Sequence, residues 1–352
     1  MPADLGIIEG YYGTPWTWAA RREQVSFLKP HGYRFFIYAP KADPYLRKRW
    51  AEPHPADMAA ELRGLAEHCA AEGVRFGVGL SPFEIYRDFG DEAKAALARK
   101  LEELDSFGVQ DLGILFDDMR GDLPDLASTQ VDIVHWIAGR TKADRVIMCP
   151  TYYSDDPMLD RGFGDRPAGY LEELGRGLDR GIEVFWTGEE VCSREYTTGH
   201  LARVTGQLGR KPFLWDNYPV NDGPRMSPYL YIRSFTGRPA AMGEHLSAHA
   251  VNPALQAVLS RVPCLTLAES YRDGDEYQYG EAFRRAAHAV LGEAGGKMLI
   301  RHLGLLNDTG LGNLEPETHQ RMIERWSEID HDGAREVLAF LNGEYRVTRM
   351  EE

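Results

Sequence analysis

Short apolar runs of strand length alternate with longer segments of helical periodicity along most of the chain. The runs are rich in aliphatic, β-branched and aromatic residues, which is typical of strands. They span residues 5–8, 34–38, 74–80, 112–116, 145–148, 182–186 and 213–215. Apolar residues at three- and four-residue steps predict helices between them, over residues 56–71, 92–107, 129–137 and 168–178. This alternation predicts a parallel sheet with crossover helices.

Seven strands are one short of a closed barrel. We expect the eighth at residues 245–251, where Leu246, Ala248 and Ala250 alternate with other residues. A (β/α)8 TIM-type barrel is therefore favoured over a doubly wound open sheet, and a length of 352 residues suits one barrel of about 250 residues with an addition.

The pattern changes after about residue 262, because no further strands are predicted. Helices are expected at 277–290, 297–305, 315–327 and 334–341, separated by Gly or Asp-Gly breaks. We therefore divide the chain into a barrel over residues 1–262 and a helical C-terminal region over residues 263–352. That region could pack on the barrel or supply a homodimer contact, and both alternatives stay open.

Charge and composition exclude several classes of protein. A formal net charge of -14 disfavours nonspecific binding to nucleic acid or to anionic membranes. No apolar run approaches the roughly 20 residues that span a bilayer, and the first residues lack a signal-peptide pattern, so we expect a cytoplasmic protein. The four cysteines form no CxxC pair, which favours reduced thiols over a zinc or redox motif.

Two adjacent carboxylates, Asp117 and Asp118, follow the apolar run that ends at Phe116. Like charges side by side raise each other's free energy when they lose solvent, so one of them should hold its proton more tightly, as an acid catalyst needs. A turn with Asp caps would explain the same residues. Both interpretations fit this stretch alone.

Polar and aromatic residues follow the other predicted strands as well, where barrel enzymes carry their chemistry. Taken one at a time, Gly10 could be a turn glycine, Lys41 a lysine on the surface and Trp215 an aromatic residue of the core. Together, aromatic rings, amides and carboxylates are the groups that stack on a pyranose and bind its hydroxyls, so they indicate a sugar. The stretches after the strands are 9–13, 39–43, 117–118, 149–153, 186–188, 215–222 and 252–253.

These stretches resemble glycoside hydrolase family 84, the β-N-acetylglucosaminidases that include the protein O-GlcNAcases and enzymes once called hyaluronidases. The resemblance runs in order from residue 6 to about residue 253. It is carried by Gly-Ile-Ile-Glu-Gly-Tyr-Tyr-Gly-Thr-Pro-Trp at 6–16, Tyr-Ala-Pro-Lys-Ala-Asp-Pro-Tyr at 38–45, Phe-Asp-Asp at 116–118, Cys-Pro-Thr at 149–151 with Tyr153, Trp-Thr-Gly at 186–188, and Trp-Asp-Asn at 215–217 with Asn-Asp at 221–222.

The resemblance implies a (β/α)8 catalytic domain and a retaining, substrate-assisted mechanism. The nucleophile would be the 2-acetamido group of the sugar, which forms an oxazoline. By position, Asp117 resembles the aspartate that polarises the acetamido group, and Asp118 resembles the general acid and base. The implied substrate-binding residues are Gly10, Tyr12, Lys41, Tyr153, Val191, Trp215, Asn217, Asp222 and Asn252.

Within this set, the resemblance implies which part of the sugar each residue would contact. Asp222 would bind O4 and O6, while Gly10, Lys41, Asn217 and Asn252 would bind sugar hydroxyls. Of the other implied binding residues, Tyr153 would hold the acetamido group or the oxazoline, and Val191 would lie near the acetamido methyl group. Tyr12 and Trp215 would form the walls of the pocket.

The sequence departs from the family pattern at two positions. Tyr152 stands where the family usually has Glu, and Met119 stands where it usually has an aliphatic residue. Neither change touches the predicted acid or the acetamido-polarising residue, so activity is expected, while contacts to the leaving group are expected to differ.

The resulting hypothesis is an exo-acting β-N-acetylglucosaminidase for glycoprotein or oligosaccharide substrates, without a metal or another cofactor. One alternative is a barrel enzyme whose Asp117, Asp118 and Asp122 hold a divalent metal, since hard cations prefer carboxylate oxygens. A second alternative is a barrel that binds N-acetyl sugars without cleaving them. A homodimer through residues 262–352 is a further hypothesis.

Overall fold

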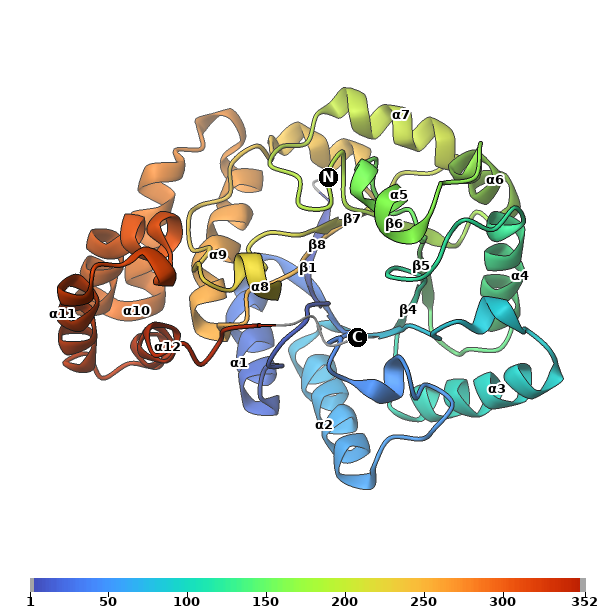
Figure 1. Ribbon diagram of the computed structural model, residues 1–352, viewed down its shortest axis with the longest axis horizontal. Coiled ribbons are helices and arrows are strands. Elements are labelled where there is room, and N and C mark those ends of the chain that lie inside the picture. Colours follow the sequence, from blue (N-terminus) through green and yellow to red (C-terminus); the bar gives the residue numbers. More distant parts are fainter. Residues whose placement is uncertain (1–2, 349–352) are drawn as a thin grey trace.

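The computed structural model describes residues 3–348 and contains a closed barrel of eight parallel strands in chain order (Figure 1). The barrel closes where β1 pairs with β8, through Asp4 beside Ala248 and Ile7 beside Val251. The strands are β1 (Asp4–Glu9), β2 (Tyr33–Tyr38), β3 (Arg75–Leu80), β4 (Asp111–Leu115), β5 (Arg145–Cys149), β6 (Glu183–Trp186), β7 (Phe213–Asp216) and β8 (Ala248–Val251).

The predicted (β/α)8 barrel is therefore confirmed, and each of the eight predicted strands overlaps an observed one. The eighth strand is shorter than predicted, since residues 240–245 form a 3₁₀ turn that follows Pro239. Leu246 is buried just before β8 against the side chains of Leu201 and Met242.

Helices surround the barrel and continue beyond it on one side (Figure 1). They are α1 (Trp18–Leu28), α2 (Ala56–Glu72), α3 (Asp91–Ser106), α4 (Leu126–Ala138), α5 (Pro157–Phe163), α6 (Tyr170–Gly177), α7 (Thr198–Leu208), α8 (Gly223–Met226), α9 (Ala257–Asp273), α10 (Tyr279–Gly304), α11 (Pro316–Ser327) and α12 (Asp332–Leu341). None of the helices within residues 3–348 is long and apolar enough to cross a membrane, and the cytoplasmic location stays a prediction.

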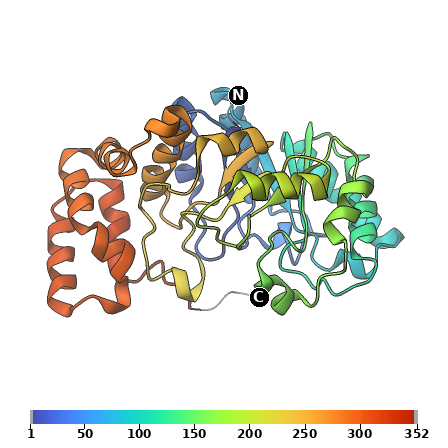
Figure 2. The ribbon, with the colours of Figure 1, turned by 90° about the horizontal axis from the view of Figure 1, so that it is seen from above.

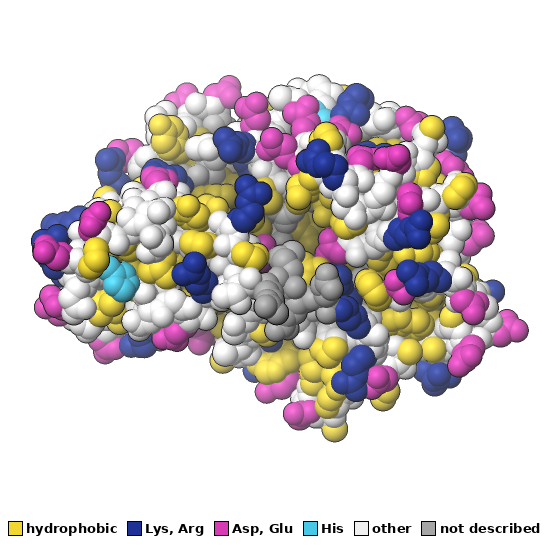
Figure 3. Space-filling view, in the orientation of Figure 1, with side chains coloured by type: hydrophobic (Ala, Val, Ile, Leu, Met, Phe, Trp, Pro, Cys, Tyr) yellow, Lys and Arg dark blue, Asp and Glu magenta, His cyan; other side chains and the backbone are white. Residues whose placement is uncertain are grey.

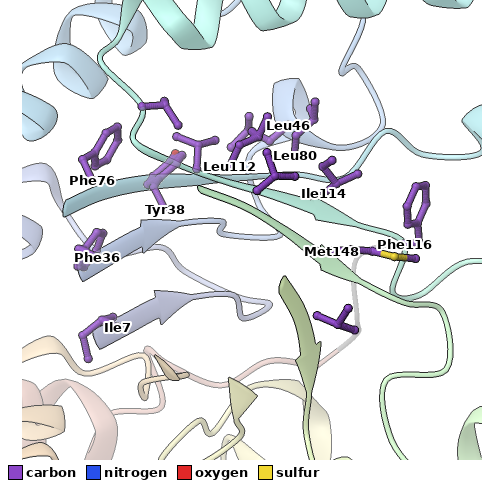
Figure 4. Close-up of a cluster of buried hydrophobic side chains, with 14 of the residues drawn as sticks. Ile7, Phe36, Tyr38, Leu46, Phe76, Leu80, Leu112, Ile114, Phe116 and Met148 are labelled. Atoms are coloured by element: carbon purple, nitrogen blue, oxygen red, sulfur yellow. The ribbon is translucent and has the colours of Figure 1, made fainter. Parts of the chain in front are cut away.

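Side chains of each strand alternate between two cores, because successive residues of a strand point to opposite faces. On β2, Phe35 and Ile37 belong to the core inside the barrel, whereas Phe36 and Tyr38 belong to the core between the strands and the helices. Figure 4 shows part of this outer core, to which β4 adds Ile114. Both cores fix the strands, and the strands in turn fix the loops at their carboxyl ends.

The helical region, α10 to α12, lies beside α9 and away from the rest of the barrel (Figure 2). It has a core of its own, in which the buried Trp326 donates a hydrogen bond to His302 Nδ1 over 3.1 Å. The predicted helices at 277–290 and 297–305 correspond to two helical segments of α10 that meet at a kink at Gly292, where the backbone is not helical and φ is 70°.

The division of the chain at residue 262 stays a prediction. Helix α9 spans this position and belongs to both neighbours, since Val258 and Val262 enter the core of the helical region while Cys264 and Leu267 enter the core around the barrel. The outermost residues of the two predicted parts, 1–2 and 349–352, lie outside the described residues.

Candidate active site

A cavity of about 1380 Å³ opens at the carboxyl ends of the strands. Figure 3 shows the hollow in this face, with hydrophobic side chains within it and Lys or Arg side chains near its edge. The structure brings all eleven site residues predicted from the sequence to the wall of this one cavity. They are Gly10, Tyr12, Lys41, Asp117, Asp118, Tyr153, Val191, Trp215, Asn217, Asp222 and Asn252.

Asp117 and Asp118 follow β4 after one residue, Phe116, and have different surroundings. The Asp117 side chain is 8% exposed and the Asp118 side chain is 25% exposed. Asp118 has a φ of 58°, in the left-handed region that non-glycine residues rarely adopt. Such strain is kept only where the surrounding structure enforces it, and it clusters at functional sites.

Lys41 lies between the two carboxylates. Its ammonium group pairs with Asp117 Oδ2 and lies 3.6 Å from Asp118 Oδ2. Burial lowers the pKa of Lys41, but the two carboxylates outweigh it and raise this pKa above its usual value, so the lysine stays charged. Its positive charge permits two carboxylates to lie side by side.

One oxygen of Asp117 is buried without a hydrogen-bond partner among residues 3–348. Lys41 occupies Oδ2, while Oδ1 has no donor. Burial raises the pKa of Asp117; Lys41 opposes this effect and Asp118 adds to it. A buried acceptor without a donor costs free energy, so Oδ1 is suited to accept an N–H or O–H group from a ligand.

Tyr12 connects the acid pair with Asp222. Its hydroxyl donates to Asp118 Oδ2 over 2.6 Å, and its backbone N–H donates to Asp222 Oδ2 over 2.8 Å. The guanidinium of Arg47 lies 5.6 Å from the centre of the Tyr12 ring. Burial raises the pKa of Asp222 above its usual value. Two carboxylates from different strand ends are thus held by one tyrosine.

The amides of Asn217 and Asn252 form a chain of hydrogen bonds at the ends of β7, β8 and β1, which are neighbours in the barrel. Asn217 Oδ1 accepts from Trp215 Nε1 over 3.1 Å and from Asn252 Nδ2 over 2.9 Å. Asn252 Oδ1 accepts from the backbone N–H of Gly10 over 3.1 Å. Asn217 Nδ2 donates to the backbone oxygen of Val191 over 2.8 Å. These bonds fix which end of each amide faces the cavity.

Gly10 is required by the close approach of Trp215. A Cβ at this position would overlap the six-membered part of the indole ring. The glycine therefore lets the tryptophan ring approach the end of β1 closely, next to the amide chain.

Two buried ion pairs hold the ends of β1 and β7, and Arg238 of the second pair also lines the cavity. Glu9 precedes Gly10, is fully buried, and accepts from Arg21 Nε over 2.7 Å. Asp216 precedes Asn217 and accepts two hydrogen bonds from Arg238, at 2.6 and 2.9 Å. Arg238 also donates to the backbone oxygen of Ser193 over 2.9 Å, which holds the loop that carries Val191.

Sequence reasoning missed the outer half of the cavity. Its wall comes from α5, from the loop after β7 and from the helical region, and it includes Met158, Leu159, Phe163, Tyr229, Tyr231, Tyr279, Phe283 and Leu303. Met158 and Tyr279 are the large hydrophobic side chains with high exposure in the described chain, at 50% and 64%. The pair Asp156-Pro157 is a helix-start signal that could have located α5, but no sequence pattern shows which of its side chains face the cavity.

The residues present do not fit a divalent metal. Lys41 holds its ammonium group between the two carboxylates, and a cation there would be repelled. Asp122 does not line the cavity and pairs with Arg120 instead. Across residues 3–348, no group of three or more His, Cys, Asp or Glu side chains is arranged to hold a metal ion.

Comparisons with known proteins agree with this geometry. The family model of β-N-acetylglucosaminidases matches residues 5–302. Protein O-GlcNAcase of Rattus norvegicus is 28% identical over 279 residues, which are 76% of this chain and 30% of that protein. The chain thus spans less than a third of the length of this curated relative.

Solved structures extend the likeness to almost the whole chain. A mutant of the O-GlcNAc hydrolase of Thermobaculum terrenum is 32% identical, with a TM-score of 0.78 over 92% of this chain and 70% of that one. The structure of CpGH84B is 23% identical, with a TM-score of 0.77 over 97% of this chain and 66% of that one. At this lower identity the likeness to CpGH84B shows a shared fold alone.

Proposed function

The chain belongs to the β-N-acetylglucosaminidase family, glycoside hydrolase family 84, and on that premise we propose that it is a retaining exo-β-N-acetylglucosaminidase that uses substrate-assisted catalysis. The observation that carries the proposal is the free, buried Oδ1 of Asp117 beside the more exposed carboxylate of Asp118. One carboxylate can then accept an N–H group of the substrate while the next exchanges a proton with the leaving oxygen.

The inner half of the cavity offers the groups that a terminal N-acetylglucosamine needs. Asp222 would bind the O4 and O6 hydroxyls, and Asn217 and Asn252, at the same run of neighbouring strand ends, would bind further sugar hydroxyls. Trp215 and Tyr12 supply aromatic walls for the sugar ring. Because Tyr12 and Asn252 are already hydrogen-bonded to their neighbours, this half is organised before the sugar enters.

In the first step, Asp117 Oδ1 would accept the acetamido N–H and so direct the acetamido oxygen toward the anomeric carbon. That oxygen forms a bond to the anomeric carbon as the bond to the leaving oxygen breaks, and Asp118 gives its proton to the leaving oxygen. The product of this step is an oxazoline in its protonated, oxazolinium form, whose N–H stays hydrogen-bonded to Asp117, and Tyr153 and Val191 would enclose it.

In the second step, Asp118 would take a proton from water as the water oxygen attacks the anomeric carbon. The bond between this carbon and the acetamido oxygen breaks, and the electron pair returns to the acetamido group. Two displacements on opposite faces restore the β-configuration, so the enzyme would be retaining.

The outer half of the cavity would receive the leaving group. Exposed Met158 and Tyr279 offer apolar surface there, on α5 and on the helical region. The relatives named as O-GlcNAc hydrolases and O-GlcNAcases support a glycoprotein substrate with O-linked N-acetylglucosamine. We therefore propose a peptide leaving group, with an oligosaccharide as the alternative.

Hydrolysis of 4-methylumbelliferyl N-acetyl-β-D-glucosaminide by wild type and by Asp117→Asn tests the mechanism. We expect release by wild type, the same rate with EDTA, and a loss of about a hundredfold in the variant, because the acetamido group would no longer be held for attack. A folded variant that keeps the full rate contradicts the role of Asp117.

The remaining outcomes revive the alternatives. Turnover that EDTA abolishes would favour the metal-dependent enzyme. Binding of N-acetylglucosamine by calorimetry without any turnover would favour the sugar-binding barrel.

A further inference from the structure

Helix α5 forms the part of the cavity wall that would face the leaving group. Met158, Leu159, Gly162 and Phe163 of this helix line the cavity. The helix has only seven residues, from Pro157 to Phe163. A helix of this length is not stable by itself, so contacts with the rest of the protein must set its position.

Two hydrogen bonds, accepted by adjacent backbone carbonyl groups, hold the C-terminal end of α5. The backbone oxygen of Phe163 accepts from the backbone N–H of Gly121 over 2.8 Å. The backbone oxygen of Gly164 accepts from the Tyr152 hydroxyl over 2.6 Å. Gly121 follows Asp118 by three residues in the loop after β4, so the wall is tied to the loop that carries the proposed acid.

The junction around Tyr152 is closely packed. The Tyr152 side chain is fully buried, and its ring meets the Tyr170 ring edge-on, with centroids 5.4 Å apart. A Cβ at Gly121 would overlap the Tyr152 ring, and a Cβ at Gly164 would overlap the Asp122 side chain. The two glycines therefore allow the loop after β4, Tyr152 and the end of α5 to meet at one point.

The hydrogen bond of Tyr152 depends on a donor at this position. A tyrosine hydroxyl can donate to a carbonyl oxygen, whereas an ionised carboxylate only accepts. A carboxylate at this position could not make the bond to Gly164 in its ionised form.

We propose that Tyr152, in the loop after β5, is a positioning residue that holds the end of α5 through Gly164, beside the loop of Asp118, and thereby sets the specificity for the leaving group. The inference rests on the proposed function. Tyr152 itself does not line the cavity, so it acts through Phe163, which does. A substrate whose leaving group touches this wall depends on the hydrogen bond to Gly164, and a substrate with a very small leaving group does not.

The test compares Tyr152→Phe with wild type on two substrates, a peptide that carries O-linked N-acetylglucosamine and N-acetyl-β-D-glucosaminyl fluoride, whose leaving group is one atom. Loss of one hydrogen bond should raise KM for the glycopeptide about three- to tenfold. We expect kcat/KM for the fluoride to stay within about twofold, because no wall contact is involved.

Tyr33→Phe is the matched control. The buried Tyr33 hydroxyl also donates to a backbone carbonyl, that of Cys264, over 2.9 Å, and it lies in the core around the barrel, away from the cavity. This variant should have the wild-type KM for the glycopeptide and the wild-type kcat/KM for the fluoride. Amide hydrogen exchange of residues 157–164 should be faster in Tyr152→Phe and not in Tyr33→Phe. This measurement would show that α5 is held less firmly, and it does not depend on enzymatic activity.

Three results would overturn the inference. They are equal losses on the peptide and the fluoride, an unchanged KM for the peptide, and unchanged exchange of residues 157–164. If wild type hydrolyses neither substrate, the proposed function fails, and hydrogen exchange alone then decides whether Tyr152 holds α5.

Discussion

Asp117 and Asp118 are neighbours in the sequence with separate environments in the fold. The left-handed φ of Asp118 turns the backbone at this point. Asp117 pairs with Lys41, while Asp118, 3.6 Å from the same ammonium group, accepts from the Tyr12 hydroxyl. Two carboxylates in different surroundings can take different roles in one reaction.

Replacement of Asp118 should affect substrates according to their leaving groups. In Asp118→Asn the leaving oxygen receives no proton, which matters little for an activated dinitrophenyl leaving group and much for a serine hydroxyl. We expect a loss of about 10²- to 10⁴-fold in kcat/KM for the poor leaving group and a far smaller loss for the activated one. Steady-state rates on a series of aryl glycosides check this prediction. Equal losses across the series would contradict the role as acid.

Replacement of Gly10 should disturb the sugar pocket without unfolding the barrel. In Gly10→Ala the added methyl group overlaps the Trp215 ring, which must move, and overpacking of this kind costs about 1–3 kcal/mol. Because the displaced ring no longer lines the sugar pocket in its native position, we also expect a loss of about tenfold in kcat/KM, which corresponds to about 1.4 kcal/mol of transition-state stabilisation. Gly206→Ala is the matched control, since a Cβ on Gly206 in α7 meets no atom within 4 Å. A wild-type rate for Gly10→Ala would show that the close approach has no function.

At the scale of elements, the link between α12 and α9 predicts a dependence of stability on pH. Glu336 of α12 accepts from the backbone N–H groups of Val258 and Leu259, both over 2.9 Å, at the start of α9, where such groups have no partner within the helix. Burial raises the pKa of Glu336 to about 7, while the hydrogen bonds to α9 oppose this effect.

Because this pKa is raised in the folded state, the folded protein binds the proton of Glu336 more tightly than the unfolded chain does. The resulting stability is complete below the unfolded pKa and is lost as the pH rises through about 7. Between pH 5 and pH 8 the wild type should lose about 2–3 kcal/mol of unfolding free energy relative to Glu336→Gln. Urea unfolding at both pH values measures this difference. Glu328→Gln, at an exposed position of the same region, should behave as wild type, and parallel pH profiles for wild type and Glu336→Gln would contradict the prediction.

The elements that could be predicted from the sequence are those in which a hydrophobic period repeats many times, together with the ends of the strands. The barrel strands, α2 and α3 were found because a two-residue or 3.6-residue period repeats over enough residues to be seen. The eleven site residues were named through the resemblance to family 84, and their roles stay predictions. They meet at one cavity because most of them follow strands, and parallel strands bring their carboxyl ends together.

Other features depend on contacts between distant segments and could not be predicted. The link from Tyr12 to Asp222 joins residues 210 positions apart. The seven residues of α5 are too few to show a period, and the hydrogen bond to Gly164 needs the position of Tyr152 in space. Likewise, no sequence pattern shows that α10 would add Tyr279 to the cavity wall.

At the scale of the whole molecule, the cavity is shared by the barrel and the helical region. The helical region brings Tyr279, Phe283 and Leu303 to the side opposite α5. Removal of this region would therefore remove one wall of the proposed leaving-group site as well as the partners of α9.

A homodimer through residues 262–352 stays a prediction. Tyr279 is 64% exposed on this region, which leaves apolar surface for a second copy or for a substrate. Light scattering should give twice the chain mass of 39.7 kDa if the dimer forms. A mass of one chain at high protein concentration would contradict it, and Tyr279→Ala should weaken the dimer if this side chain is part of the contact.

The pairing of β1 with β8 also determines how late in synthesis the barrel can close. The first strand ends at Glu9, but its second neighbour begins at Ala248, so the ribosome must add most of the chain before the barrel can close. At about 5–20 residues per second, this interval lasts roughly ten to fifty seconds. Throughout that time one edge of β1 exposes unpaired backbone groups, which can recruit other strands. A nascent chain of this protein is thus most exposed to misassembly, and most dependent on a chaperone, before its last strand has left the ribosome.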